Sequence, residues 1–330
     1  PTDAEGLRED LTTNVCAAVR VISADQVENH RNKFMAVMRQ VRPDSEGECA
    51  ATPHGANGCG FVAAYGHSQH PHVWEVRLAP KMRTALSGVY GTPETSMAVS
   101  CDNVFYWGED SGREAPPKFI DDKDAFKAVK SLLGSSLRLH IDVAKNDSHG
   151  ANVQRELSKY AFPYSLQAQV NLYDVTATSA GLVLVDGDME FGDDSGYFEN
   201  RNSDYCQVTS AGYEAFREKL VKPCVPAGCA LIWRSDRVHA NCKAQYGEDP
   251  KRLGVFVTWH PRLFEYDRKR KFECIQEGMV GTHWPLQVPD KRSLNRWKRA
   301  GSHMSNGGQL SKKVVCEFSA ELSNRIMEAI

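Results

Sequence analysis

The sequence predicts an α+β protein in which helices brace an antiparallel double sheet or jelly roll. One observation is the first 134 residues, where helix-like segments alternate with loops. The other is a change, after that point, to short β-rich runs that turn residues bound. Short strands at uneven spacing, after a helical half, are typical of packed antiparallel sheets.

The helix signals in the first part are local. Ser23 and Gln26 form a capping-box pattern, which predicts a helix over residues 24–41. Pro80 opens a second, short helix, because proline suits the first helical turn. A third helix-like segment ends at Gly134. We therefore expect mainly helices and loops before the sheets begin.

The second part contains five β-rich runs and one helix-like insert. Branched and aromatic residues dominate the runs, and turn residues separate them. The predicted strands are LRLHID, LQAQVNLYDV, GLVLVDG, CALIWRS and LGVFVTWH, and the predicted helix is SAGYEAFREKLV.

Composition sets the broad class of the protein. A chain of 330 residues, 41% of them hydrophobic, is long enough to bury a sizeable core. No apolar run approaches the ~20 residues needed to cross a bilayer, so we expect no membrane partner. The N-terminal residues lack the features of a secretory signal. Ten cysteines without Cys-x-x-Cys spacing indicate reduced thiols in an intracellular protein, cytoplasmic or nuclear.

The chemistry-bearing pattern lies at the end of the first predicted strand. His140 and Asp142 are two residues apart, so a strand places both side chains on one face. The pair alone fits a hydrogen-bonded couple as well as a metal site. His239, just after a later apolar strand, supplies a third ligand. Two histidines and one carboxylate form the facial set that non-haem iron(II) oxygenases use, with open positions opposite.

A basic pair precedes the strand that follows His239. A 2-oxo acid bound to the metal needs a cation for its far carboxylate. Arg252 can make a bidentate contact with that group, whereas Lys251 is only a point charge. The order along the chain, with His140 and Asp142 first, His239 next and Arg252 last, is therefore the order expected of an oxygenase site.

Two stretches resemble a known family. They are AYGHSQHPHVWEVRLAPKMRTALSGVYGTPETSMAVSCDNVF and QAQVNLYDVTATSAGLVLVDG. With the ligand order, they make residues 20–262 similar to the phytanoyl-CoA dioxygenase-like branch of the iron(II)/2-oxoglutarate oxygenases. The resemblance implies a double-stranded β-helix (a cupin-like jelly roll), with iron(II) held by His140, Asp142 and His239. It also implies 2-oxoglutarate bound by Arg252, and O₂ as the oxidant.

The resemblance also assigns contacts around the site. Gln169 or Tyr173 is expected to face it from the neighbouring strand. Where the family often has PGSH, this chain has VDGDMEF, so the substrate does not follow from the family. The GHSQHPH run fits a loop near the site mouth better than a second metal site. Candidate substrate contacts are His70, Asp102, Trp107, Asp186, Arg296 and Lys298.

We expect one domain over residues 1–330. Residues 1–134 supply helical support and substrate-side elements, and residues 135–262 form the core with the metal site. Residues 263–330 form a basic extension and a terminal helix. The charge supports this division: residues 261–315 carry twelve Lys or Arg and five Asp or Glu, an excess of seven in a chain of net charge −2.

The basic segment has two interpretations. One is a solvated, charged surface. The other is a phosphate-contacting surface, with Trp284 or Trp297 as a stacking platform. The second interpretation gives DNA as a partner, whereas the first leaves a small organic substrate.

Three functions follow from these patterns. The leading one is an iron(II)-dependent dioxygenase that oxidises a C–H bond of an organic substrate, coupled to 2-oxoglutarate. An alternative is a nucleic-acid base oxygenase acting on 5-methylcytosine, with ascorbate as a replacement for the oxo acid. A non-catalytic jelly-roll binding module is the alternative of another class. The sequence does not predict an oligomeric state.

Overall fold

The computed structural model describes most of the chain and places it in the α+β class, as the sequence predicts. Its sheets are antiparallel and its helices pack around them. The described residues are 3–41, 64–108, 139–143, 149–187, 196–199, 204–244, 248–249, 251–289 and 316–330. The segment that was expected to end at Gly134 lies outside them.

Two five-stranded sheets form the centre of the molecule. The first sheet has the order β1-β9-β5-β11-β3, and the second has the order β7-β4-β10-β6-β8. The strands of the first sheet are β1 Ala17–Arg20, β9 Cys229–Arg234, β5 Leu166–Asn171, β11 Arg252–Phe256 and β3 Val104–Trp107. Those of the second sheet are β7 Cys206–Gln207, β4 His140–Ile141, β10 His239–Cys242, β6 Gly181–Val185 and β8 Leu220–Val221. A small third sheet pairs β12 Trp259–Pro261 with β2 Met97–Val99.

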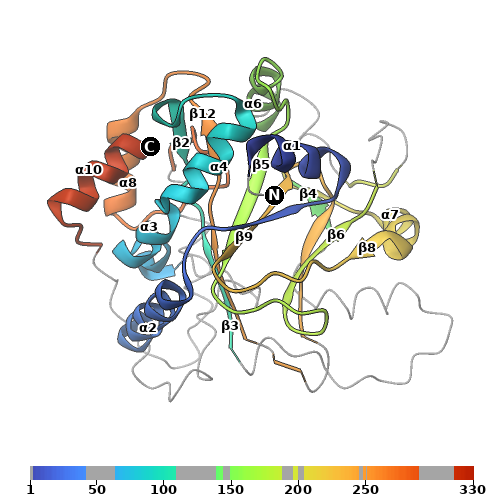
Figure 1. Cartoon of the computed structure of the whole chain (residues 1–330), viewed down its shortest axis with the longest axis horizontal. Coiled ribbons are helices and arrows are strands. Elements are labelled where there is room, and N and C mark those ends of the chain that lie inside the picture. Colours follow the sequence, from blue (N-terminus) through green and yellow to red (C-terminus); the bar gives the residue numbers. More distant parts are fainter. Residues whose placement is uncertain are drawn as a thin grey trace.

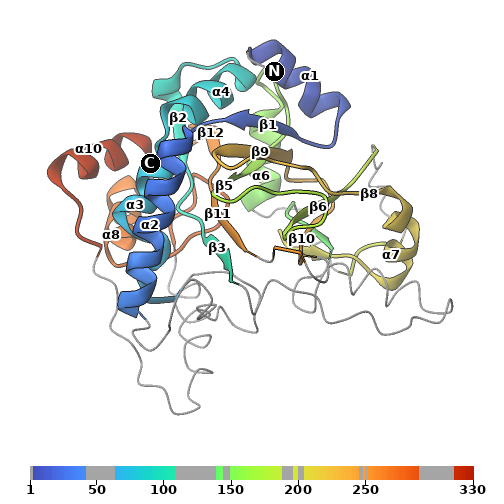
Figure 2. The same ribbon diagram turned by 60° about the horizontal axis from the view of Figure 1, so that its bottom comes forward.

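Helices cover the outer faces of both large sheets (Figures 1 and 2). Those packed on the first sheet share one apolar cluster with its strands, whereas α7 packs on the second sheet. The helices are α1 Ala4–Thr13, α2 Ala24–Val41, α3 Pro71–Arg77, α4 Pro80–Tyr90, α6 His149–Leu157, α7 Ser210–Phe216, α8 Arg268–Gln276 and α10 Ala320–Ala329. Single 3-10 turns occur at η2 Ala64–Gln69, η3 Glu94–Ser96 and η4 Arg217–Lys219.

The space between the two large sheets holds a separate apolar cluster. Phe105, Leu184 and Trp233 come from three strands of the two sheets and are all buried there. β5 shows why polar groups also enter this space. Its apolar residues Leu166, Ala168 and Val170 belong to the apolar cluster between the first sheet and its helices, which we call the helix-side cluster. Because side chains alternate along a strand, Gln167, Gln169 and Asn171 point into the space between the two sheets. Three polar side chains on the inner face of a buried strand are costly to desolvate, so each needs a hydrogen-bond partner inside the molecule.

Local sequence signals account for several element boundaries. The Ser23 backbone N–H donates to Gln26 Oε1 at 2.8 Å, so the predicted capping box begins α2. α4 begins at Pro80 and ends before Gly91, whose φ of 66° suits glycine. The expected strands contain β4, β5, β6, β9 and β11, and α7 is the helical insert.

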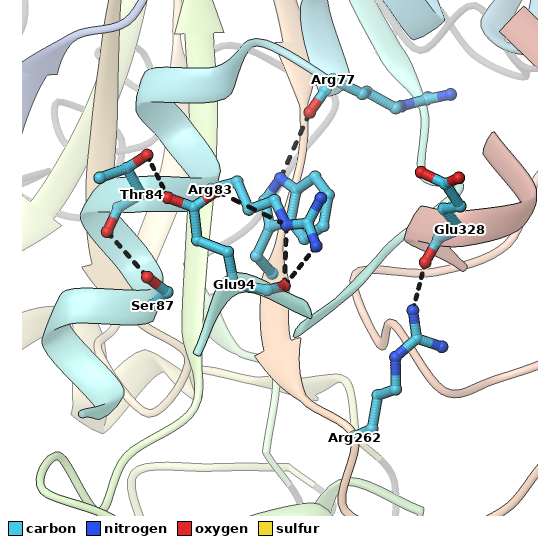
Figure 3. A network of polar contacts seen from close by, with 8 residues as sticks. Arg77, Arg83, Thr84, Ser87, Glu94, Arg262 and Glu328 are labelled. Atoms are coloured by element: carbon cyan, nitrogen blue, oxygen red, sulfur yellow. Dashed lines mark hydrogen bonds and ion pairs between the residues drawn. The ribbon is translucent and has the colours of Figure 1, made fainter. Parts of the chain in front are cut away.

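The C-terminal segment packs onto the body of the protein. Arg262 donates to the backbone carbonyls of Ile330 and Glu328, and Arg268 donates to those of Ile330 and Met327. These carbonyls end α10, where cations interact well with the helix dipole. Figure 3 shows the Arg262 contact beside the one between Arg83 and Glu94 that ties α4 to η3. The predicted terminal helix is thus held by residues of the basic segment.

Two cations of the basic run DRKRK are bound within the molecule. Lys271 is fully buried and donates to the carbonyls of Val99 and Pro285. Arg270 pairs with Glu273 at 3.1 Å, and Arg268 binds the end of α10. Lys269 of this run is exposed.

One expected surface feature is buried. Trp284, a candidate stacking platform, has 2% of its surface exposed and packs beside His149 and His260. That expectation is wrong, because the residues after α8 fold back onto the helix-side cluster. Trp297, Arg296 and Lys298 lie outside the described residues. Among the helices that the structure describes, none is long and apolar enough to span a bilayer.

Candidate metal centre

Two adjacent strands bring the predicted histidines together. β4 and β10 pair antiparallel with His140 directly opposite His239, so both side chains project from the same face. Their ring centroids are 4.3 Å apart. The sequence placed His239 after a strand, whereas the structure makes it the first residue of β10. That register is what aligns the two imidazoles.

Asp142 completes the set. Its Oδ2 atom lies 3.2 Å from Nε2 of His239 and 3.7 Å from Nε2 of His140. One ligand atom from each of the three residues lies within 4.8 Å of the others. In the described part of the chain, this is the one group of three such side chains that meets this distance. Two imidazole nitrogens and a carboxylate oxygen are the donor set that fits iron(II).

Neighbouring groups fix the orientation of these ligands. Nδ1 of His239 lies 2.9 Å from the carbonyl oxygen of Arg237, which only accepts. This contact turns Nε2 of His239 toward Asp142 and His140. Gln167 Nε2 donates to Asp142 Oδ2 at 2.9 Å, and the Asp142 backbone N–H donates to Ser235. The carboxylate is thus held from both its backbone and its side chain.

The electrostatics of the site keep Asp142 ionised. Burial alone would raise the pKa of this carboxyl. The charge interaction with His140 and the hydrogen bond to His239 outweigh burial, so its pKa lies well below the ordinary value. An ionised carboxylate at neutral pH is the form that binds a cation.

Arg252 lies at the start of β11, inside the space between the sheets. It is 1% exposed, and no carboxylate of the described residues lies within ion-pair distance. Its guanidinium donates to the carbonyl of Gly181 and, at 2.8 Å, to Oε1 of Gln169. It also lies 4.4 Å from the centre of the Phe105 ring. Burial lowers the pKa of Arg252 to about 9. A buried cation without an acid partner indicates a site for an anion.

Gln169 links Arg252 to the inner face of β5. Its Oε1 accepts from Arg252, while its buried Nε2 has no acceptor among the described residues. Gly254 makes room for this amide, since a Cβ at that position would lie 2.3 Å from Gln169 Nε2. The Nε atom of Arg252 is likewise buried without an acceptor. Two neighbouring side chains therefore each bury a donor without an acceptor among the described residues.

The other expected contacts divide between the site and the rest of the molecule. Trp107 lies inside, opposite Arg252 in the β11–β3 register. Asp186 is exposed just after β6, two residues beyond Leu184, which pairs with His239.

Three expected contacts lie away from the triad or are committed to local structure. Tyr173 is placed elsewhere: β5 ends at Asn171, and the Tyr173 ring packs against Arg31 of α2 on the helix side. It is therefore not brought to the site with Gln169.

His70 belongs to a different cluster. Its Nδ1 lies 2.5 Å from that of His72, which packs with His67 around Phe34 between α2 and α3. The described residues form no second metal set there that meets the 4.8 Å distance. The run is also helical rather than a loop, because Ala64–Gln69 form a 3-10 turn and Pro71 starts α3.

Asp102 acts mainly on its own loop. Its Oδ1 accepts from the backbone N–H of Asn103 at 2.6 Å, and its carbonyl accepts from Arg77. Burial raises the pKa of its carboxyl. Arg296 and Lys298 lie outside the described residues, so their relation to the triad stays a prediction.

Residues that the sequence did not single out also line the site. Gln167 holds Asp142, and a polar Gln-x-Gln-x-Asn pattern on an apolar strand was the signal for it. Tyr205 lies 4.6 Å from the ring of His140 and is 36% exposed. Register explains this position, because Cys206 pairs with Ile141 and places Tyr205 opposite Asp142. No sequence pattern marks Tyr205, since strand pairing at long range creates the contact.

Comparisons with known proteins show similarity at the level of structure. No family model matches the chain, and no curated protein sequence matches it. The crystal structure of GlcNAc Inducible Gene 2, GIG2 (DUF1479), from Candida albicans has a TM-score of 0.54 and 12% identity. It covers 99% of this chain and 77% of its own. At that identity the likeness shows the fold alone.

Other similar structures are named as non-heme alpha ketoglutarate dependent enzymes. The epimerase SnoN, in complex with Fe3+, alpha ketoglutarate and nogalamycin RO, has a TM-score of 0.46 and 13% identity, with 96% of each chain covered. The carbocyclase SnoK from nogalamycin biosynthesis also has a TM-score of 0.46, with 15% identity, 78% of this chain and 86% of its own covered. Scores below 0.5 carry no argument about this site. The likeness is one of fold, and the resemblance to the phytanoyl-CoA dioxygenase-like branch stays a prediction.

Proposed function

We propose that this chain is a non-haem iron(II)-dependent dioxygenase that uses 2-oxoglutarate to oxidise a C–H bond of an organic substrate. The convergence of His140, Asp142 and His239 on one point carries the proposal. The buried cation of Arg252, which has no acid partner among the described residues, supports the choice of co-substrate.

The fold that suits this function is a double-stranded β-helix. From β3 to β6 and from β8 to β11, successive strands alternate between the two sheets, whereas β6, β7 and β8 all lie in the second. A chain that winds back and forth in this way encloses the face on which His140 and His239 lie. We extend the proposal to the domain as a whole, with residues 135–262 as its core.

The residues present fit the proposed metal and co-substrate. The triad offers two imidazoles and one carboxylate, which suit iron(II). Arg252 Nε and Gln169 Nε2 are donors without acceptors, as a carboxylate site requires. Bound iron(II) supplies the electron-transfer chemistry with O₂ that side chains lack.

The chain's own residues bind, orient and exclude water. Arg252 supplies the positive charge for the far carboxylate of the oxo acid, and Gln169 holds the guanidinium in place at 2.8 Å. Gln167 keeps Asp142 turned toward the two imidazoles. The apolar residues Phe105 and Leu184 surround the enclosed space, which strengthens charge interactions inside it.

A coupled assay tests this function. Purified protein with Fe(II), O₂, 2-oxoglutarate and a thiol reductant, which takes up the second oxygen atom in place of the organic substrate, is expected to release succinate and CO₂, and His239→Ala is expected to abolish the release. The matched control is His260→Ala, which removes a buried histidine outside the triad. Succinate release by His239→Ala at the wild-type rate, or no release by the wild type, would contradict the proposal.

The substrate class stays open between a small organic molecule and DNA. The described part of the basic segment gives no added support for DNA, because Arg268 and Lys271 are bound within the protein. The DNA prediction therefore rests on residues 291–299. Binding of labelled DNA should weaken with a log–log salt slope of about −0.9 per phosphate contact. Changing Arg296, Lys298 and Arg299 together to Ala should reduce that slope if the segment contacts phosphate.

Ascorbate in place of 2-oxoglutarate belongs to the same test. If the wild type consumes ascorbate but not the oxo acid, the metal assignment stands and the co-substrate changes. A non-catalytic binding module would consume neither. The buried Arg252 favours an enzyme over that third function, because a purely structural strand gains nothing from an unpaired interior cation.

A further inference from the structure

Trp233 is a buried neighbour of the triad that the proposed function has not used. It lies in β9 and is fully buried in the space between the sheets. Its ring centroid lies 5.4 Å from that of His239. In the β5–β9 register it stands directly opposite Gln167, the residue that bonds Asp142. Residues that are directly opposite on paired strands share a face, so Trp233 and Gln167 flank the triad together.

The indole N–H of Trp233 has no acceptor among the described residues. Two other buried tryptophans differ in this respect. Trp74 donates to Gln69 Oε1 at 3.1 Å, and Trp259 donates to the Arg77 carbonyl at 3.3 Å. Buried indole N–H groups normally find a partner, because leaving one unsatisfied loses the full cost of desolvation. An exception beside a metal triad therefore indicates a partner that the chain itself does not contain.

The unsatisfied donors form a line across three adjacent strands. Trp233 Nε1 is on β9, Gln169 Nε2 is on β5, and Arg252 Nε is on β11. Trp233 is level with Gln167, at the triad end of β5. Arg252 lies past the opposite end of β5, because Gly254, two residues after it, pairs with Asn171, the last residue of β5. All three groups are N–H donors, so the molecule that satisfies them carries oxygen acceptors at both its ends.

We propose that Trp233 is a co-substrate-binding residue whose indole N–H donates to an oxygen of a 2-oxo acid at its metal-bound end. Arg252 and Gln169 hold the far carboxylate of the same molecule. This inference rests on the proposed function and adds a contact at the end of the site opposite Arg252. It also separates the roles of the buried tryptophans: Trp74 and Trp259 are structural, and Trp233 binds a ligand.

The first test compares Trp233→Phe with Trp74→Phe. Both changes remove the same atoms from a buried position, but only Trp74 loses a hydrogen bond within the protein. Metal-free Trp74→Phe should melt at a lower temperature than metal-free Trp233→Phe. With Zn²⁺ as a redox-inert metal, 2-oxoglutarate should bind Trp233→Phe about 10- to 100-fold more weakly than wild type, as expected for one hydrogen bond to a charged group. Trp74→Phe should bind it with wild-type affinity.

A second measurement does not depend on how the variant folds. Wild-type protein with ¹⁵N-labelled indoles is titrated with 2-oxoglutarate in the presence of Zn²⁺. The Trp233 indole N–H resonance should move on binding, while those of Trp74 and Trp259 stay in place. Resonances are assigned from the Phe variants of the other tryptophans if Trp233→Phe does not fold.

The outcomes separate this inference from the proposed function. If wild type binds the oxo acid while Trp233→Phe binds it equally well and the indole resonance is unmoved, the Trp233 contact is wrong and the proposed function stands. If wild type with Zn²⁺ binds no 2-oxoglutarate, the choice of co-substrate fails and the Trp233 contact fails with it. Weaker binding together with a shifted Trp233 resonance supports both.

Discussion

The buried guanidinium of Arg252 permits a prediction in which stability and binding respond differently. We consider Arg252→Met, which keeps an unbranched apolar side chain but removes the charge. Burial lowers the pKa of Arg252 from 12.5 to about 9, which corresponds to a cost of roughly 5 kcal/mol for the charged form in the metal-free protein. Its hydrogen bonds to Gly181 and Gln169 offset this by about 3–6 kcal/mol together.

The two contributions nearly cancel, so metal-free Arg252→Met should unfold within ~2 kcal/mol of wild type. Binding of an anion behaves differently, because the charge pair forms only with the ligand. Loss of a buried charge pair costs ~2–5 kcal/mol, so affinity for 2-oxoglutarate should fall by tens- to thousands-fold. The assays are urea unfolding without metal and calorimetric titration of 2-oxoglutarate with Zn²⁺. Lys251→Met is the matched control and should change neither quantity appreciably.

Two results would refute this reasoning. A collapse in stability of Arg252→Met would make the cation a structural group that the fold itself requires. Unchanged affinity for the oxo acid would place the carboxylate clamp elsewhere, or would mean that another reductant takes the place of the acid. Either result leaves the metal triad to be judged on its own measurement.

Three further changes have defined outcomes. Gly254→Ala should raise the KM for 2-oxoglutarate without lowering iron content, since the new Cβ displaces Gln169; a normal KM in the presence of the methyl group would show that the Gln169 amide is not needed. Gln167→Leu should weaken iron binding by about 10- to 100-fold, measured by competition with a chelator, because Asp142 loses the donor that orients it; unchanged affinity would contradict this role. Lys271→Met should remove a rise in stability between pH 8 and pH 10.5. Burial lowers the pKa of Lys271 from 10.5 to about 8, so the unfolded chain binds more protons in that window and stability increases with pH. Equal pH profiles for wild type and variant in urea unfolding would argue against this.

Short-range signals in the sequence predicted much of the fold. The capping box at Ser23 and the proline at Pro80 mark real helix starts, because backbone hydrogen bonding near a helix end depends on neighbours in sequence. The β-rich runs contain five strands of the core. Short strands such as β1 and β10 were missed, since they are stabilised by pairing with distant segments rather than by their own composition.

The candidate site shows the same division. His140 and Asp142 were predictable because strand periodicity alone puts them on one face. His239 was named correctly as a partner, but its pairing with His140 depends on strand register, which the sequence does not display. The resemblance gave Gln169 or Tyr173 as the residue facing the site. β5 ends at Asn171, and the Tyr173 ring packs against Arg31 of α2 on the helix side. Contacts between side chains of different strands and helices therefore could not be predicted from the sequence and required the structure.

The central claim is that His140, Asp142 and His239 hold one iron(II) ion. The most direct measurement is anaerobic titration of the metal-free protein with Fe(II), with bound iron counted per chain after gel filtration. We expect one iron per wild-type chain, and a large loss of bound iron in the double variant His140→Ala/Asp142→Ala, whose circular dichroism spectrum should remain that of wild type. One iron per chain in a folded double variant, or none in the wild type, would contradict the account.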